Sequence, residues 1–279
     1  MLHGFNLKLD NNDFNNQPIT VSDDSRYVRD SLNHLVEKDG VIDGDRLESE
    51  WFPLLSSKKV FISHSHSDEL IAKRFASFLK EKFSLESFID STVWGYSDQL
   101  IKKINDQYSR IEGENLYSYE KCNVTASHVY TLLSNALNLM IDHCECLIFL
   151  NTDNSVDNHS LSSKIRAGVS TYSPWLMSEL RTSSVIRNRP MIKRTEMALD
   201  SLTFNESLRK SAGLESSSVK VSYSLPIEHL HKLNAEIISK WVGFNRNSYK
   251  GYDALTELYN LAAGTNYNLG SEESKSLVW

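Results

Sequence analysis

The sequence lacks the features that define several classes of protein. Cysteine occurs only three times in 279 residues, an odd count that is too small for a disulfide framework. No apolar run approaches the roughly 20 residues that span a bilayer, and the first residues contain no apolar signal-peptide segment. The net charge is −6, which gives no broad basic surface for nucleic acid or anionic membranes. These absences predict a soluble cytoplasmic protein with neither of those partners.

Three glycine-centred motifs of nucleotide and ester chemistry are also missing, namely GxGxxG, GxxxxGK(S/T) and GxSxG. Rossmann dinucleotide binding, P-loop NTPase activity and the α/β-hydrolase mechanism therefore lose their usual support. Hydrophobic residues nevertheless make up 40% of the chain and charged residues 24%, which is ordinary usage for a folded domain. The composition predicts a chain that buries a core of its own.

Short apolar segments alternate with helical patterns in the middle of the chain. Val60–Ile62, Glu86–Ile89 and Cys146–Leu150 have the composition of buried strands. Apolar residues between Val129 and Ile141 recur at i, i+3, i+4 and i+7, which is one face of a helix. Ser173-Pro174 is a typical helix start, with serine as N-cap and proline at the first helical position. This alternation predicts an α/β fold with a parallel sheet covered on both faces.

The composition divides the chain into three parts. Residues 1–57 are expected to form an N-terminal arm and a helical flank, in which the polar stretch 1–30 is loosely held and Trp51-Phe52-Pro53 ends a helix. Residues 58–265 are expected to form the α/β domain. Residues 266–279 are expected to be a C-terminal tail.

Two connections inside the α/β domain are unusually long and polar. They cover residues 105–127 and 151–173. Structureless loops of this length are usually functional or disordered. Both follow positions close to strands, where open α/β sheets bind their ligands, so they are expected to border a site.

Trp175 and Glu179 lie four residues apart in the helix that starts at Ser173. This spacing places the indole and the carboxylate on one helix face, about 6 Å apart. A W-x-x-x-E pattern alone also fits a surface glutamate beside a core tryptophan. Its position after the third strand and a long polar loop favours a functional role for the glutamate.

The turn after the first strand contains His64, His66 and Asp68 in the order H-x-H-x-D. This order resembles the first ligand cluster of metallo-β-lactamase-like hydrolases, but Glu69 stands where that class has a further histidine. A zinc site needs three or four placed ligands, and no other histidine has a convincing ligand context. The sequence therefore predicts no metal, and the turn is interpreted as a binding loop or as a polar loop that caps a helix.

Two other groups carry weaker signals. Cys144 and Cys146 are interpreted as buried structural thiols. Asp90 ends the second strand, and the loop after it carries Trp94 and Tyr96. These two aromatic residues either pack back onto the core or stack on a ligand ring.

The order of the motifs resembles that of a TIR (Toll/interleukin-1 receptor) domain of the bacterial enzymatic kind. Val60–Asp68 is similar to the first strand and following loop of that family, and Phe88–Asp90 to the end of the second strand. Ser91–Gln99 is similar to the loop that forms assembly contacts and gates the nucleotide pocket. Ser173–Leu180 is similar to the family's S-x-W-x-x-x-E-L segment, so the likeness covers residues 60–187.

The resemblance implies a flavodoxin-like fold with helical N- and C-terminal flanks. It implies cleavage of the nicotinamide–ribose bond of NAD⁺, which is a substrate here and not a cofactor. The product would be ADP-ribose or a cyclic or conjugated ADP-ribose signal in bacterial anti-phage defence, as in Thoeris-type systems. The catalytic residue would be Glu179, and the substrate-binding residues would be Ser63, His64, Ser65, His66, Asp90, Trp94, Tyr96 and Trp175.

The implied partners are NAD⁺, other copies of the chain through TIR surfaces, and a downstream effector that senses the product. Two alternatives remain. One is a non-catalytic TIR module that nucleates assemblies through the loop after its second strand. The other is a zinc-dependent hydrolase that uses His64, His66 and Asp68. A glutamate at position 179 that faces a cleft beside the histidine-containing turn would favour the NAD⁺-cleaving enzyme, because an assembly module has no need of it.

Overall fold

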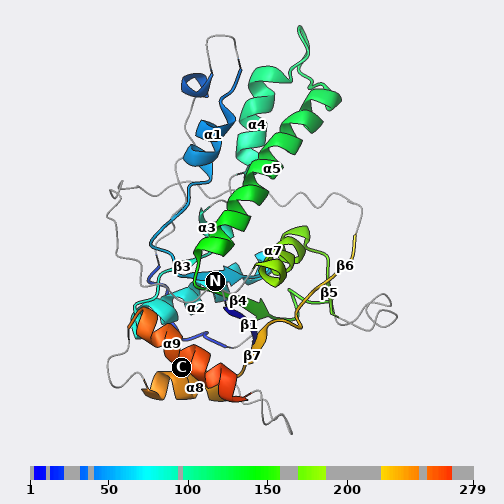
Figure 1. Ribbon diagram of the computed structural model, residues 1–279. Coiled ribbons are helices and arrows are strands. Elements are labelled where there is room, and N and C mark those ends of the chain that lie inside the picture. The colour runs from blue at the N-terminus through cyan, green and yellow to red at the C-terminus, as the bar shows by residue number, and fades with distance from the viewer. Residues whose placement is uncertain are drawn as a thin grey trace.

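A parallel β-sheet lies at the centre of the protein, and helices cover it on both faces (Figure 1). This arrangement confirms the predicted fold class, a flavodoxin-like α/β fold. The computed structural model describes residues 3–10, 13–21, 32–36, 41–93, 97–157, 169–186, 221–244 and 250–265.

The main sheet has five strands in the order β3-β2-β4-β1-β7, and every neighbouring pair is parallel. In chain order these strands are β1 (His3–Lys8), β2 (Val60–Ser63), β3 (Ser87–Phe88), β4 (Cys146–Asn151) and β7 (His231–Leu233). The predicted strands near residues 60, 86 and 146 are thereby confirmed as β2, β3 and β4. Counted from β2, the order β3-β2-β4 is the 2-1-3 order of flavodoxin-like sheets.

The first strand corrects the prediction for the N-terminus. Residues 1–30 were expected to be loosely held, but β1 lies inside the sheet between β4 and β7. Its six residues pair with β4 from His3 opposite Cys146 to Lys8 opposite Asn151. Phe5 and Leu7 are completely buried. The first residues of the expected flank are therefore part of the α/β unit.

One face of the sheet is covered by α1 (Gly44–Trp51), α4 (Ser97–Tyr108), α5 (Tyr119–His143) and α7 (Pro174–Val185). The predicted end of the first of these helices at Trp51-Phe52 is confirmed. The strand residues that pack against these helices alternate with those that face the other way, as expected for sheet geometry. On this face they are Phe61, Phe88, Leu147 and Phe149.

The opposite face is covered by α2 (Glu69–Phe83), α8 (Ala235–Phe244) and α9 (Tyr252–Thr265). Trp241 of α8 stacks on Phe83 of α2, with ring centroids 3.7 Å apart. The sheet residues buried beneath these helices are Phe5, Leu7, Val60, Ile62, Cys146, Ile148, Leu150 and Leu233.

The predicted polar connection over residues 105–127 is wrong, because most of it is helical. Helix α4 runs to Tyr108, and α5 begins after Ser118, whose side chain accepts a hydrogen bond from the backbone of Lys121. Together α4 and α5 form a hairpin that projects away from the sheet (Figure 1). Exposed apolar and aromatic side chains gather near its end, namely Tyr108, Ile111, Leu116, Tyr117, Tyr119 and Val124.

A second, two-stranded sheet lies next to α7. Its strands are β5 (Ser170–Thr171) and β6 (Tyr223–Ser224), which pair in antiparallel fashion. Strand β5 ends the other predicted long connection, 151–173, of which residues 158–168 lie outside the described part. Among the helices of the described residues, none combines the length and apolar character that crossing a bilayer requires.

The place of β1 in the core leads to a stability prediction. Phe5→Ala should destabilise the protein by about 3–5 kcal/mol, because it removes a fully buried ring from an inner strand. The melting temperature should fall by about 2–4 °C for each kcal/mol. Lys8→Ala, at an exposed position of the same strand, should change stability by less than about 0.5 kcal/mol. Equal unfolding curves for the two variants would contradict the position of β1.

Candidate active site

Helix α7 presents a glutamate toward the sheet. The helix starts as predicted, because the Ser173 side chain accepts a hydrogen bond from the backbone of Leu176 and Pro174 occupies the first turn. Glu179 is only 3% exposed. It belongs to the buried stripe of the helix, whose spacing of three and four residues marks one face. That stripe consists of Leu176, Glu179, Leu180 and Ser183.

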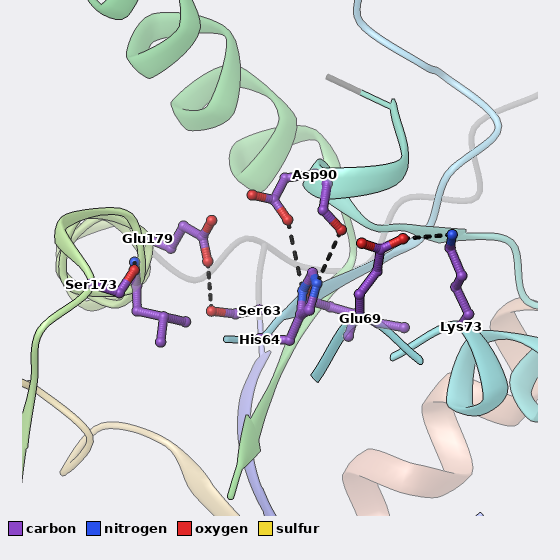
Figure 2. Close-up of polar contacts among 10 residues, drawn as sticks. Ser63, His64, Glu69, Lys73, Asp90, Ser173 and Glu179 are labelled. Atoms are coloured by element: carbon purple, nitrogen blue, oxygen red, sulfur yellow. Dashed lines mark hydrogen bonds and ion pairs between the residues drawn. The ribbon is translucent and has the colours of Figure 1, made fainter. Parts of the chain in front are cut away.

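Glu179 contacts the end of β2 (Figure 2). The hydroxyl of Ser63 donates a hydrogen bond of 2.6 Å to Oε2 of Glu179. Ser63 is the last residue of β2 and is completely buried. It lies two residues after Phe61, and so it projects toward the same face of the sheet, where α7 packs. The carboxylate is therefore held at the carboxyl end of an inner strand, where open α/β sheets bind ligands.

The surroundings of Glu179 disfavour its negative charge. Burial raises the pKa of the Glu179 carboxyl well above its usual range, and the nearby charge of Asp90 raises it further, while the hydrogen bond from Ser63 opposes both effects. Among the described residues, no cationic side chain forms an ion pair with Glu179. A positively charged ligand at this position would therefore stabilise the ionised carboxylate.

His64 follows Ser63 and links the end of β2 to the end of β3. Its side chain is 1% exposed, and its Nδ1 lies 3.7 Å from Oδ1 of Asp90 and 3.4 Å from the carbonyl oxygen of Ile62. Its Nε2 lies 3.2 Å from the hydroxyl of Ser91. Asp90 and Ser91 are the first two residues of α3 (Asp90–Val93), directly after β3. The structure thus brings together Ser63, His64, Asp90 and Glu179 (Figure 2). Ser91 joins them through its contact with His64.

The simpler interpretation of the W-x-x-x-E motif, a surface glutamate beside a core tryptophan, is wrong for the glutamate, while Trp175 packs at the edge of the core. Glu179 is buried, while Trp175 is half-buried. The indole packs against Tyr130 of α5, with ring centroids 6.0 Å apart. In the described structure, the contacts of Trp175 thus connect α7 to α5, whereas the contact of Glu179 is with β2.

Four other residues were expected to bind the substrate, namely Ser65, His66, Trp94 and Tyr96. Ser65 is half-buried, and His66 is exposed in η2 (His66–Asp68), a short 3-10 helix. Trp94 and Tyr96 lie outside the described residues. The expected loop over Ser91–Gln99 is partly helical, since α3 extends to Val93 and α4 begins at Ser97.

A second polar cluster, which the sequence analysis missed, joins the turns after β2 and β4. The buried carboxylate of Asp68 accepts hydrogen bonds from Oγ1 of Thr152 at 2.5 Å and from Nδ2 of Asn154 at 2.7 Å. Asp68 stands at the N-cap position of α2, but its side chain does not bond to the helix backbone, and so the capping role considered for this turn is not observed. Instead, its hydrogen bonds attach the turn that contains His64 to the residues that follow β4. The polar residues directly after Cys146–Leu150 were the available signal for this contact.

The described residues do not form a metal site. His64, His66 and Asp68 do not converge, because the first contacts Asp90 and Ser91, the second is exposed, and the third contacts the turn after β4. In the part of the chain that the structure describes, no group of three or more His, Cys, Asp or Glu residues is arranged to hold a metal ion.

Two of the three cysteines are buried, as expected from their interpretation as structural thiols. Cys144 and Cys146 are both buried and free of disulfides. Burial raises the pKa of both thiols above the usual range, and so the reactive thiolate form is disfavoured.

A hollow of about 280 Å³ lies between α1 and α5, apart from the Glu179 cluster. It includes the carboxylates Asp45 and Glu48 above an apolar floor that contains Phe52 and Leu139. None of its lining residues belongs to the group around Glu179, and its acidic groups lie on an open helix face. The candidate active site is therefore identified from its side-chain chemistry and not from the size of a cavity.

The raised pKa of Glu179 leads to a prediction about stability and pH. Glu179→Gln keeps an acceptor for Ser63 but removes the charge, and so it should be more stable than the parent protein at pH 8. As pH rises above about 4.3, the unfolded carboxyl ionises first, and the parent loses stability until its folded carboxyl also ionises. The advantage of the variant should therefore shrink on acidification toward pH 4.

Urea unfolding at several pH values measures this difference. Glu112→Gln, at an exposed position in the loop between α4 and α5, is the matched control and should show no such pH-dependent gain. A gain for Glu179→Gln that is the same at pH 4 and pH 8 would contradict a buried, ionisable carboxylate as its cause.

Comparisons with models of protein families, with curated proteins and with solved structures gave no match for this chain. A functional assignment therefore depends on the motifs of the sequence and on the geometry around Glu179.

Proposed function

We propose that this protein is a TIR-like enzyme that cleaves the nicotinamide–ribose bond of NAD⁺. The observation that carries the proposal is the buried carboxylate of Glu179 at the carboxyl end of β2, where it accepts a hydrogen bond from Ser63. Within the described part of the chain this carboxylate has no cationic partner. Burial of such a group is unfavourable for folding, and groups of this kind concentrate at functional sites. The resemblance of Ser173–Leu180 to the TIR glutamate segment supports the same role.

The chemistry of NAD⁺ suits a single carboxylate. When the bond breaks, the pyridinium ring leaves as neutral nicotinamide, so little acid catalysis is needed. Positive charge develops on the ribose, as in the oxocarbenium-like transition state of glycoside hydrolysis. An ionised Glu179 in a site of low polarity stabilises that charge more than it would in water. Burial makes the ionised carboxylate less stable, and the positive charge that forms on the ribose offsets this loss.

The neighbouring side chains have roles consistent with this reaction. Asp90 is 28% exposed and adds a second negative charge near Glu179, which favours a cationic substrate. Ser63 holds one carboxylate oxygen in place, and so the other remains for the ribose hydroxyls. By the resemblance alone, Ser65 and His66 would line the pocket and contact phosphate or ribose, and Trp175 would shape the pocket wall.

The product would be ADP-ribose or a cyclic or conjugated ADP-ribose signal, and the setting would be cytoplasmic anti-phage defence in bacteria. Self-association through TIR surfaces and a downstream effector that senses the product belong to the same proposal. These points derive from the resemblance of residues 60–187 to bacterial TIR domains.

A non-catalytic assembly module is the second candidate. The observation that favours it is the exposed set of side chains near the end of the α4–α5 hairpin, which includes Leu116, Tyr117 and Tyr119. Tyrosine is enriched at protein interfaces. Such a module would bind partners without consuming NAD⁺, and it would not depend on Glu179. Measurement of NAD⁺ turnover therefore separates the two candidates.

Loss of the carboxylate should abolish the reaction. Glu179→Gln should lower the rate of nicotinamide release from NAD⁺ by about 10²-fold or more, because the amide carries no charge to stabilise the ribosyl cation. Chromatography of the reaction mixture measures nicotinamide and every ribosyl product. Glu112→Gln should retain the parent rate. Full activity of a folded Glu179→Gln protein would exclude the proposed mechanism.

The activity should also depend on pH through Glu179. Since the ionised form is the active one, kcat/KM should increase as pH rises through the raised pKa of the carboxyl and then level off. The increase should lie above the range of an ordinary glutamate, because burial and Asp90 both raise that pKa. Rates of nicotinamide release at subsaturating NAD⁺ between pH 4 and pH 9 measure it. A profile that is flat over this range would contradict the assignment.

A further inference from the structure

We infer that Asp90, His64 and Ser91 form a proton relay that activates a hydroxyl group as the attacking nucleophile. This inference rests on the proposed cleavage of NAD⁺ and specifies its second half, the capture of the ribosyl group by oxygen. The three side chains come from the carboxyl ends of β2 and β3, next to Glu179. The resemblance to TIR domains implies substrate contacts for His64 and Asp90 and no such contact for Ser91.

The surroundings of His64 fix which nitrogen of the neutral ring carries the hydrogen. Nδ1 faces the Asp90 carboxylate and the Ile62 carbonyl oxygen, both of which only accept hydrogen bonds. We therefore place the hydrogen on Nδ1, and Nε2 becomes the acceptor. The group in front of Nε2 is the hydroxyl of Ser91, which must then donate its hydrogen to the ring.

This direction of hydrogen bonding leaves the Ser91 oxygen free to accept. A water molecule or a sugar hydroxyl that donates to this oxygen would complete a chain of the form O–H···Oγ–H···Nε2. His64 is almost completely buried, whereas Ser91 and Asp90 are partly exposed. A nucleophile can thus approach the serine but not the ring, which explains why the relay would need a hydroxyl at its outer end.

The relay lies close to the group that stabilises the cation. His64 directly follows Ser63, which holds Glu179, and the charge of Asp90 acts on Glu179. The hydrogen bonds from Thr152 and Asn154 to Asp68 attach the same turn to the residues after β4, and they limit the movement of the turn. The carboxylate that would stabilise the ribosyl cation and the base that would activate its acceptor are therefore positioned by one short segment.

The bond between C1′ of the ribose and the nicotinamide nitrogen breaks, and its electron pair leaves with nicotinamide. The oxygen of the attacking hydroxyl forms the new bond to C1′ and gives its proton to Oγ of Ser91, which passes its own proton to Nε2 of His64. The imidazolium is then stabilised by the Asp90 carboxylate beside Nδ1. No oxidant or reductant takes part.

A competition between two nucleophiles tests the relay. Water must lose a proton when it attacks, whereas a pyridine base such as 3-acetylpyridine has none to lose. His64→Gln should lower the formation of ADP-ribose by about 10²-fold, the lower end for a lost general base, and should leave the exchange of nicotinamide for 3-acetylpyridine within a few-fold of the parent rate. His128→Gln, at an exposed position of α5, should change neither rate.

The outcomes separate this inference from the proposed function. If the parent protein neither releases nicotinamide nor exchanges it, the proposed NAD⁺ cleavage itself is wrong. If the parent is active and His64→Gln lowers hydrolysis and exchange equally, the relay is wrong and His64 has a structural role. Should His64→Gln fail to fold, Ser91→Ala at its partly exposed position provides the same comparison. Equal loss of both reactions in that variant would likewise overturn the relay.

Discussion

The hydrogen bond between Ser63 and Glu179 is the contact on which the arrangement of this protein depends. It joins residues 116 positions apart and connects the end of β2 to α7 inside the core. A leucine at position 179 would extend the apolar stripe formed by Leu176 and Leu180, whereas the glutamate places a charge-bearing group where water is excluded. The fold tolerates this unfavourable group at the edge of its sheet, and natural proteins commonly lose stability in this way for the sake of activity.

Parallel strands explain why so many polar side chains meet at that edge. Strands β2, β3 and β4 all run in one direction, so the residues that follow them emerge on the same side. They fall into two groups with different character. Asp68 has its carboxylate oxygens bonded to Thr152 and Asn154, as a structural link would. In the described structure, Glu179 accepts a hydrogen bond from Ser63 and lies near the negative charge of Asp90, which fits the cation-stabilising role proposed for it.

Local patterns in the sequence were sufficient for β2, β3, β4 and the start of α7, because buried apolar runs and a Ser-Pro helix start act within a few residues. Strand β1 was missed because its six residues stand among polar neighbours, and their burial depends on pairing with a strand some 140 residues away. The apolar pattern from Val129 to Ile141 correctly predicted the second half of α5. Helix α4 and the first half of α5 were missed because they project from the sheet, and much of their surface is polar. Contacts distant in sequence therefore decided β1, whereas the hairpin depends on the packing of two helices that are neighbours in the chain.

The arrangement of the candidate site, too, could be predicted only in part from local patterns in the sequence. The convergence of Ser63, His64, Asp90 and Glu179 followed from the shared direction of the strands, but the rotation of α7 about its axis did not. That rotation buries Glu179 and turns Trp175 sideways onto Tyr130 of α5. Because the two side chains lie on one face of α7, the packing of the indole against α5 constrains how far the helix can turn. The tryptophan of the motif thus helps to hold the glutamate toward the sheet, even though the two residues contact different elements.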